Sequence, residues 1–130
     1  MATISNARLD IEHDHTKKLA RCRVTAKVHF TPYERQQMPL GLRFRLDCQL
    51  WGEDLGNWLN PDDHLYNFGS KYFPDASITP TEDVTFQTTV GENLLDEDLG
   101  KDEIYSLLIL KNLYTNIIIK AKSNVVKHKF

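Results

Sequence analysis

The stretch ARCRVTAKVHF, residues 20–30, alternates apolar and polar side chains with a period of two. Its even positions are all apolar, and its odd positions are polar or basic. Because successive side chains of a β-strand point to opposite faces, the stretch predicts a strand with one core face and one basic, solvated face. A helix would bury charge, because it would bring Arg21, Ala20 and Val24 onto overlapping faces. The stretch therefore favours a β fold.

Further segments of strand character follow along the chain, at residues 3–12, 40–51, 65–73, 84–90, 104–110 and 114–126. Residues 13–17 form a polar stretch of hairpin length, so we expect 3–12 to pair antiparallel with 20–30. Residues 104–110 are apolar at even and at odd positions alike, which is typical of a central strand covered on both faces. Gly69 is expected to break the segment 65–73.

Thr31-Pro32-Tyr33-Glu34 has the features of a helix start, namely a capping residue, a proline and a glutamate three positions after the cap. We expect one helical turn near residues 32–38. Seven or eight strands within 130 residues predict an all-β fold, an antiparallel β-sandwich of immunoglobulin-like or C2-like topology. A closed barrel is the alternative. The length predicts a single domain spanning residues 1–130.

Composition indicates a cytoplasmic protein. Apolar runs stay well short of the roughly 18 residues that span a bilayer, and residues 1–6 lack the pattern of a secretory signal. Cys22 and Cys48 both fall on core-facing strand positions, as expected of buried thiols in a reducing compartment. A disulfide between them stays open as an alternative. Their spacing is unlike that of zinc ligands.

Charge is segregated along the chain although the net charge is only −2. Residues 1–49 carry +4 and residues 50–81 carry −4. Residues 82–110 carry −7, and residues 111–130 carry +5. This asymmetry predicts an electrostatic interaction site without locating it.

The most acidic segment, residues 96–103, holds five carboxylates around Gly100 between two predicted strands. Clustered carboxylates on a turn suit calcium, which takes 6–8 oxygen ligands. The form Asp-x-Asp-x-Gly-x-Asp is similar to the second calcium loop of C2 domains, over about 20 residues. The resemblance implies that Asp96, Asp98 and Asp102 bind calcium and that the chain binds a membrane only with that ion. The chain lacks the family's Ser-Asp-Pro-Tyr-like segment, and a solvated acidic loop is the alternative.

Five cations occupy outward positions of two predicted strands: Arg21, Arg23 and Lys27 on 20–30, and Arg43 and Arg45 on 40–51. If these strands are neighbours, the cations line one surface that could meet an acidic protein partner. Nucleic acid is a less favoured partner, because the outward positions lack aromatic side chains for base stacking. Such cations are also ordinary occupants of solvated strand positions.

Residues 51–73 hold six aromatic side chains interleaved with amides and carboxylates. Trp58 and Tyr66 could therefore belong to a carbohydrate site or anchor a protein contact. Alternatively, these rings pin a long loop to the sandwich.

Catalytic patterns are poor in this sequence. His13-Asp14-His15 places two imidazoles two residues apart, as in a metal site on a strand, and Asp62-Asp63-His64 offers a second set. Most histidines in turns are simply solvated. The sequence shows no nucleophile in a recognisable turn and no phosphate-binding glycine loop. We therefore expect a non-catalytic domain that binds a protein partner or a second copy of itself, with calcium-dependent and carbohydrate-binding modules as alternatives.

Overall fold

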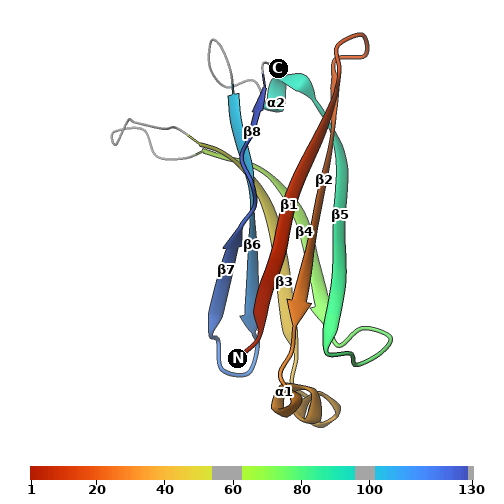
Figure 1. The fold of residues 1–130 in the computed structure, drawn as a ribbon, viewed down its shortest axis with the longest axis vertical. Coiled ribbons are helices and arrows are strands. Elements are labelled where there is room, and N and C mark those ends of the chain that lie inside the picture. Colours follow the sequence, from red (N-terminus) through yellow and green to blue (C-terminus); the bar gives the residue numbers. More distant parts are fainter. Residues whose placement is uncertain (54–62, 96–101, 129–130) are drawn as a thin grey trace.

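The computed structural model describes residues 1–53, 63–95 and 102–128 as a sandwich of two antiparallel sheets (Figure 1). The first sheet has the order β1 (Thr3–Asp14), β2 (Leu19–His29) and β5 (Thr81–Gly91). The second has the order β4 (Asp63–Phe73), β3 (Phe44–Gly52), β6 (Asp102–Asn112) and β7 (Ile118–Lys122), and β8 (Val126–His128) also pairs with β6. The predicted β-sandwich is confirmed. Among the described residues no strand pairing joins the two sheets, so the alternative of a closed barrel is wrong.

The alternation in residues 20–30 builds one half of the core. Every even position of β2 from Ala20 to Val28 is buried in the core between the two sheets, and so is Phe30, directly after the strand. The predicted pairing of residues 3–12 with 20–30 is confirmed, because β1 and β2 are antiparallel neighbours. The second sheet contributes four leucines to the same core: Leu46, Leu50, Leu108 and Leu110.

The predicted helical turn is confirmed as α1 (Pro32–Gln37). Thr31 and Glu34 form its capping box: Thr31 Oγ1 accepts from the Glu34 amide at 3.2 Å, and Glu34 Oε1 accepts from the Thr31 amide at 2.8 Å. The prediction that a strand starts at residue 40 is wrong. The chain continues from α1 into a 3-10 turn, η1 (Met38–Leu40), and Gly41 ends that turn with φ of 116°. Gly41 caps the turn in this left-handed conformation, and β3 begins only at Phe44.

The predicted break at Gly69 is also wrong. β4 continues through this residue, which adopts φ of 98°, and a register shift with β3 between Cys48 and Gln49 lies beside it. A glycine at a positive φ accommodates such a bulge without ending the ladder.

The predicted strand 114–126 is two strands. Residues before Ile118 form a turn, in which Asn116 has φ of 64°. After β7, Ser123 leaves the ladder: its hydroxyl accepts from the Ser106 amide at 2.8 Å, and its own amide donates to the Ser106 carbonyl at 2.9 Å. This detour places the Asn124 side chain against β1.

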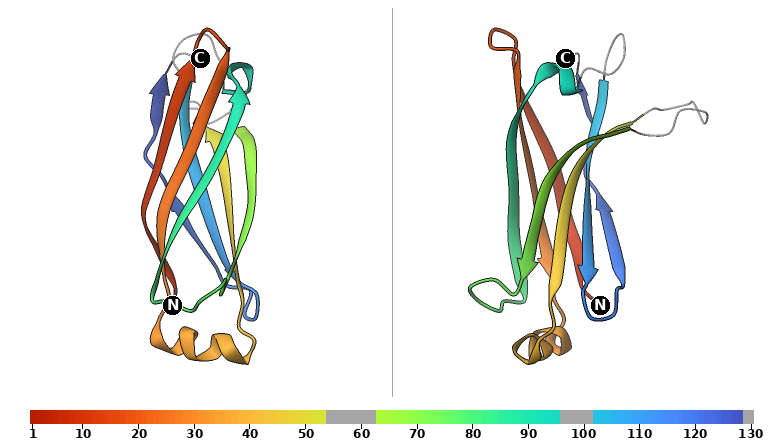
Figure 2. Two further views of the ribbon diagram at one scale, coloured as in Figure 1. Left: turned by 90° about the vertical axis from the view of Figure 1, so that its right-hand side faces the viewer. Right: turned by 180° about the vertical axis from the view of Figure 1, so that it is seen from behind.

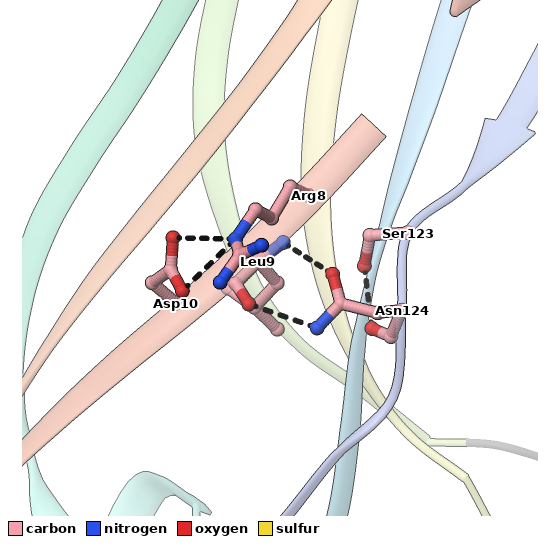
Figure 3. A network of polar contacts seen from close by, with 5 residues as sticks. All are labelled: Arg8, Leu9, Asp10, Ser123 and Asn124. Atoms are coloured by element: carbon pink, nitrogen blue, oxygen red, sulfur yellow. Dashed lines mark hydrogen bonds and ion pairs between the residues drawn. The ribbon is translucent and has the colours of Figure 1, made fainter. Parts of the chain in front are cut away.

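Asn124 ties the second sheet to the edge of the first (Figure 3). Its Oδ1 accepts from the Leu9 amide at 2.8 Å, and its Nδ2 donates to the Leu9 carbonyl at 3.0 Å. A carboxamide presents the same donor and acceptor as a neighbouring strand, so Asn124 satisfies one residue of an otherwise open edge.

β6 is central, as predicted, since it lies between β3 and the pair β7 and β8. Its outer face is only half covered, because Leu107 and Ile109 stay partly exposed. A short helix, α2 (Glu92–Leu95), directly follows β5. Among the described residues no helix is long and apolar enough to cross a membrane.

Candidate functional site

The five predicted cations do not share one surface. β2 belongs to the three-stranded sheet and β3 to the other, so their outward faces are opposite faces of the sandwich (Figure 2). A single basic surface required the two strands to be neighbours in one sheet, and they are not.

The cations of β2 pair with acids of the neighbouring strands. Arg21 lies 3.6 Å from the Glu12 carboxylate of β1, and Lys27 lies 3.9 Å from the Asp83 carboxylate of β5. Arg23 is exposed on the same face. Exposed pairs of this kind contribute little to stability, about 0–1 kcal/mol, but they reduce the positive potential of the face.

Arg45 of β3 and Arg43, which directly precedes β3, have local structural roles. Arg45 Nε donates to the Asp47 carboxylate of its own strand at 3.1 Å. Arg43 Nη1 donates to the carbonyls of Met38 and Leu42, both at 2.9 Å. Arg43 therefore ties the first residue of the 3-10 turn to the segment that enters β3.

Tyr66 packs between the two sheets. Its ring packs against the core, and its hydroxyl accepts from the Thr88 hydroxyl of β5 at 3.0 Å. The Phe68 ring lies edge-on to it, with 5.3 Å between the centroids. Tyr66 is therefore a packing residue of strand β4 and not part of a loop, and its role in a binding site stays a prediction. Trp58 lies outside the described residues, and a carbohydrate site there stays a prediction.

The proposed calcium ligands fall at the limit of the described chain. Asp96 and Asp98 lie outside the described residues. Asp102 is the first residue of β6, where its backbone is in register with His128 of β8. Calcium binding by this segment stays a prediction.

α1 and the β6–β7 turn lie at one end of the sandwich (Figures 1 and 2). Large apolar side chains of these segments are exposed. The exposed fraction is 84% for Tyr114, 78% for Leu40 and 69% for Tyr33. We name this surface the apolar end, and it comprises Tyr33, Leu40, Leu113, Tyr114, Ile117 and Ile118.

The backbone holds the segments of the apolar end together. The Leu113 amide donates to the Arg43 carbonyl at 2.9 Å, which fixes the β6–β7 turn to the segment after α1. A hollow of about 120 Å³ lies between them, lined by Glu34, Phe44, Leu110, Ile117 and Ile119. Its size suits one apolar side chain, well below the 300–1,000 Å³ of typical small-molecule pockets.

Histidines from different segments meet at the opposite end of the sandwich. Potential ligand nitrogens of His13, His15 and His128 all lie within 4.8 Å of one another. His13 Nδ1 and His128 Nε2 are 3.0 Å apart, within hydrogen-bond distance. The ring of His15 lies over that of His13, with 3.9 Å between centroids. We name these residues the histidine cluster.

A carboxylate orients the central histidine of the cluster. His13 Nε2 lies 2.8 Å from Glu92 Oε2, and the side chains are only 4% and 19% exposed. Because an ionised carboxylate only accepts, His13 Nε2 carries the proton in this contact. In the neutral ring, the Nδ1 lone pair then points toward His128. Burial lowers the pKa of His128, and the charges of His13 and His15 lower it further.

The chain matches no family model and no curated protein. Among solved structures it is similar to the X-ray structure of the Northeast Structural Genomics Consortium target SoR45, at 6% sequence identity and a TM-score of 0.40. The match covers 98% of this chain and 85% of that one. A likeness this distant has no bearing on function.

Sequence reasoning found two members of the histidine cluster and missed the others. His13 and His15 are two positions apart in the sequence, whereas His128 lies 115 residues after His13. Glu92 sits in a stretch that looks like an ordinary polar loop. In the second predicted set, Asp62 and the side chain of Asp63 lie outside the described residues, and the His64 ring lies edge-on to the Trp51 ring, with 5.3 Å between the centroids.

Proposed function

We propose that the chain is a non-catalytic interaction domain that binds an acidic protein segment through its apolar end. The observation that carries this proposal is the exposure of Tyr114, Leu40 and Tyr33, each by more than two-thirds, at one end of the sandwich. Contiguous exposed apolar surface is typical of protein contact sites, and tyrosine is a common hot-spot residue.

Charge favours an acidic partner. The two segments that build the apolar end, residues 31–43 and 111–118, carry Arg35, Arg43 and Lys111. Their single acid, Glu34, is buried and accepts hydrogen bonds from backbone amides, including that of Ala2 at 3.0 Å. An acidic segment that inserts one apolar side chain into the hollow would therefore be complementary in both charge and shape.

A second copy of the chain is the alternative occupant. Like an acidic segment, it would bury the exposed rings. The cytoplasm is the compartment that suits the proposal, since Cys22 and Cys48 are both unpaired and buried.

A displayed library of random peptides tests the proposed function. We expect selected peptides to combine Asp or Glu with one large apolar residue, and to bind more weakly as salt screens the cations. The double variant Leu40→Ser with Tyr114→Ser should weaken binding by about 30-fold or more, the effect of losing a hot spot of about 2 kcal/mol. Tyr72→Ser, which alters an exposed ring of β4, is the matched control and should bind as wild type.

Sedimentation velocity over a range of concentrations separates the two occupants. A dimer that the double variant abolishes would assign the apolar end to a second copy. A monomer that selects no peptide, or peptides that the double variant binds as tightly as wild type does, would contradict the proposal.

A further inference from the structure

We propose that His13, His15 and His128 bind one divalent transition-metal ion of the zinc, nickel or copper class. The three residues come from separate parts of the chain, namely the end of β1, the β1–β2 turn and β8. This site lies at the end of the sandwich opposite the apolar end, and it is independent of the proposed function (Figure 1).

The donor set selects the class of metal. Imidazole nitrogens suit zinc, nickel and copper, whereas calcium and magnesium prefer oxygen ligands. Two nitrogens bound to a tetrahedral zinc ion at about 2.0–2.1 Å would be about 3.3 Å apart. His13 Nδ1 and His128 Nε2 are already 3.0 Å apart, so they need to separate by only a few tenths of an ångström.

His15 completes the set from a position that can adjust. Its side chain is exposed in the β1–β2 turn, and the largest separation among the candidate nitrogens is within 4.8 Å. A rotation of this ring therefore suffices to bring its nitrogen to ligand distance. With three protein ligands, the fourth position of the ion stays open to water or an external ligand.

Glu92 supplies a separate indication of a metal site. Ligating histidines usually donate their second ring N–H to a carboxylate or carbonyl, which fixes the tautomer and makes the ligand nitrogen more basic. His13 has this arrangement, with its Nε2 on Glu92 and its Nδ1 directed into the cluster. Glu92 is itself fixed, because its amide donates to the Lys18 carbonyl at 2.9 Å at the start of α2.

The ion would join parts of both sheets. β1 belongs to the three-stranded sheet and β8 to the other, while Glu92 follows directly on β5. A metal bound here crosslinks the β1–β2 hairpin to β8, so it should stabilise the folded chain against unfolding.

Calorimetric titration of tag-free protein with Zn²⁺ near neutral pH tests the inference. We expect one ion per chain with a Kd in the micromolar range or tighter, and a rise in Tm that Ca²⁺ does not reproduce. His15→Ala and His128→Ala should each weaken binding at least tenfold. Glu92→Gln, which removes a positioning residue, should weaken it by about 10- to 100-fold.

Two controls keep the test decisive. His13 is buried, so His13→Ala could fail to fold, and the exposed His15 carries the test in its place. His64→Ala removes an exposed histidine outside the cluster and should leave the Kd unchanged. Co²⁺ should give the intense visible absorption of a four-coordinate site in wild type and lose it in His15→Ala. Absence of Zn²⁺ binding, or a Kd that both His15→Ala and His128→Ala leave unchanged, would overturn the inference.

Discussion

At the scale of single residues, burial in the core determines the ionisation and reactivity of the two cysteines. Both side chains are fully buried among apolar neighbours and are unpaired. Burial raises the pKa of Cys22 to about 11 and that of Cys48 to about 12, although a contact with the Ser106 hydroxyl opposes the rise at Cys48. The neutral thiols are poor nucleophiles, which argues for a packing role.

These pKa values have a consequence for stability. An unfolded thiol ionises near pH 9, whereas the folded thiols stay neutral until about pH 11 or 12. The stability contributed by the neutral thiols is therefore fully present below pH 9 and is lost as pH rises through this window. Each thiol should lower the free energy of unfolding by up to about 1.4 kcal/mol per pH unit there.

Urea unfolding on both sides of pH 9 measures this effect. Other groups titrate in the same range, so the informative quantity is the difference in slope between wild type and the double variant Cys22→Ala with Cys48→Ala. We expect the variant to lose stability less steeply with pH. Equal slopes would show that the buried thiols ionise as readily as unfolded ones.

At the scale of elements, the edge of β1 depends on a single side chain. A register shift between Ser5 and Arg8 interrupts its pairing with β2. The Asn124 side chain then hydrogen-bonds both the amide and the carbonyl of Leu9 (Figure 3). An open edge offers unpaired backbone groups to other chains, so this contact also limits edge-to-edge association.

Asn124→Ala removes both hydrogen bonds at this edge. We expect the free energy of unfolding to fall by about 1–3 kcal/mol, because the Leu9 amide and carbonyl lose their partners in a partly buried site. Amide hydrogen exchange should report faster exchange at Leu9, more than at the β2 residues paired with β5. Asn93→Ala, at an exposed position of α2, is the control. Unchanged protection at Leu9 would contradict the assigned role.

Local sequence patterns predict some elements of this fold, whereas others depend on contacts between distant parts of the chain. β2 was predictable because its alternation of apolar and polar residues is a local pattern. α1 was predictable because its capping residues and its proline all lie within residues 31–34. The end of β7 was not predictable, because it is coupled to the contact between Asn124 and Leu9, which are 115 residues apart in the sequence. The same limit applies to the histidine cluster. The spacing of His13 and His15 in the sequence indicates a possible metal site, whereas only the folded structure brings His128 and Glu92 next to them.

At the scale of the whole molecule, the two proposed sites lie at opposite ends of the same strands. The apolar end lies by α1 and the β6–β7 turn, and the histidine cluster lies by the β1–β2 turn and α2 (Figures 1 and 2). β2 and β3 are each paired on both sides along their length. Their inward side chains are buried in one continuous core, which leaves little freedom for a second arrangement.

Coupling between distant sites requires an element with two arrangements that both ligands bias. The doubly paired strands between these ends offer none, so we expect the sites to act independently. Saturating Zn²⁺ should change the Kd of a peptide bound at the apolar end by less than about twofold, against the 5- to 150-fold of typical allosteric coupling. The titration is run with wild type and with His15→Ala, which controls for metal bound elsewhere. A tenfold change seen only in wild type would show that the ion reorganises the sandwich, and would make the histidine cluster a regulatory site for the apolar end.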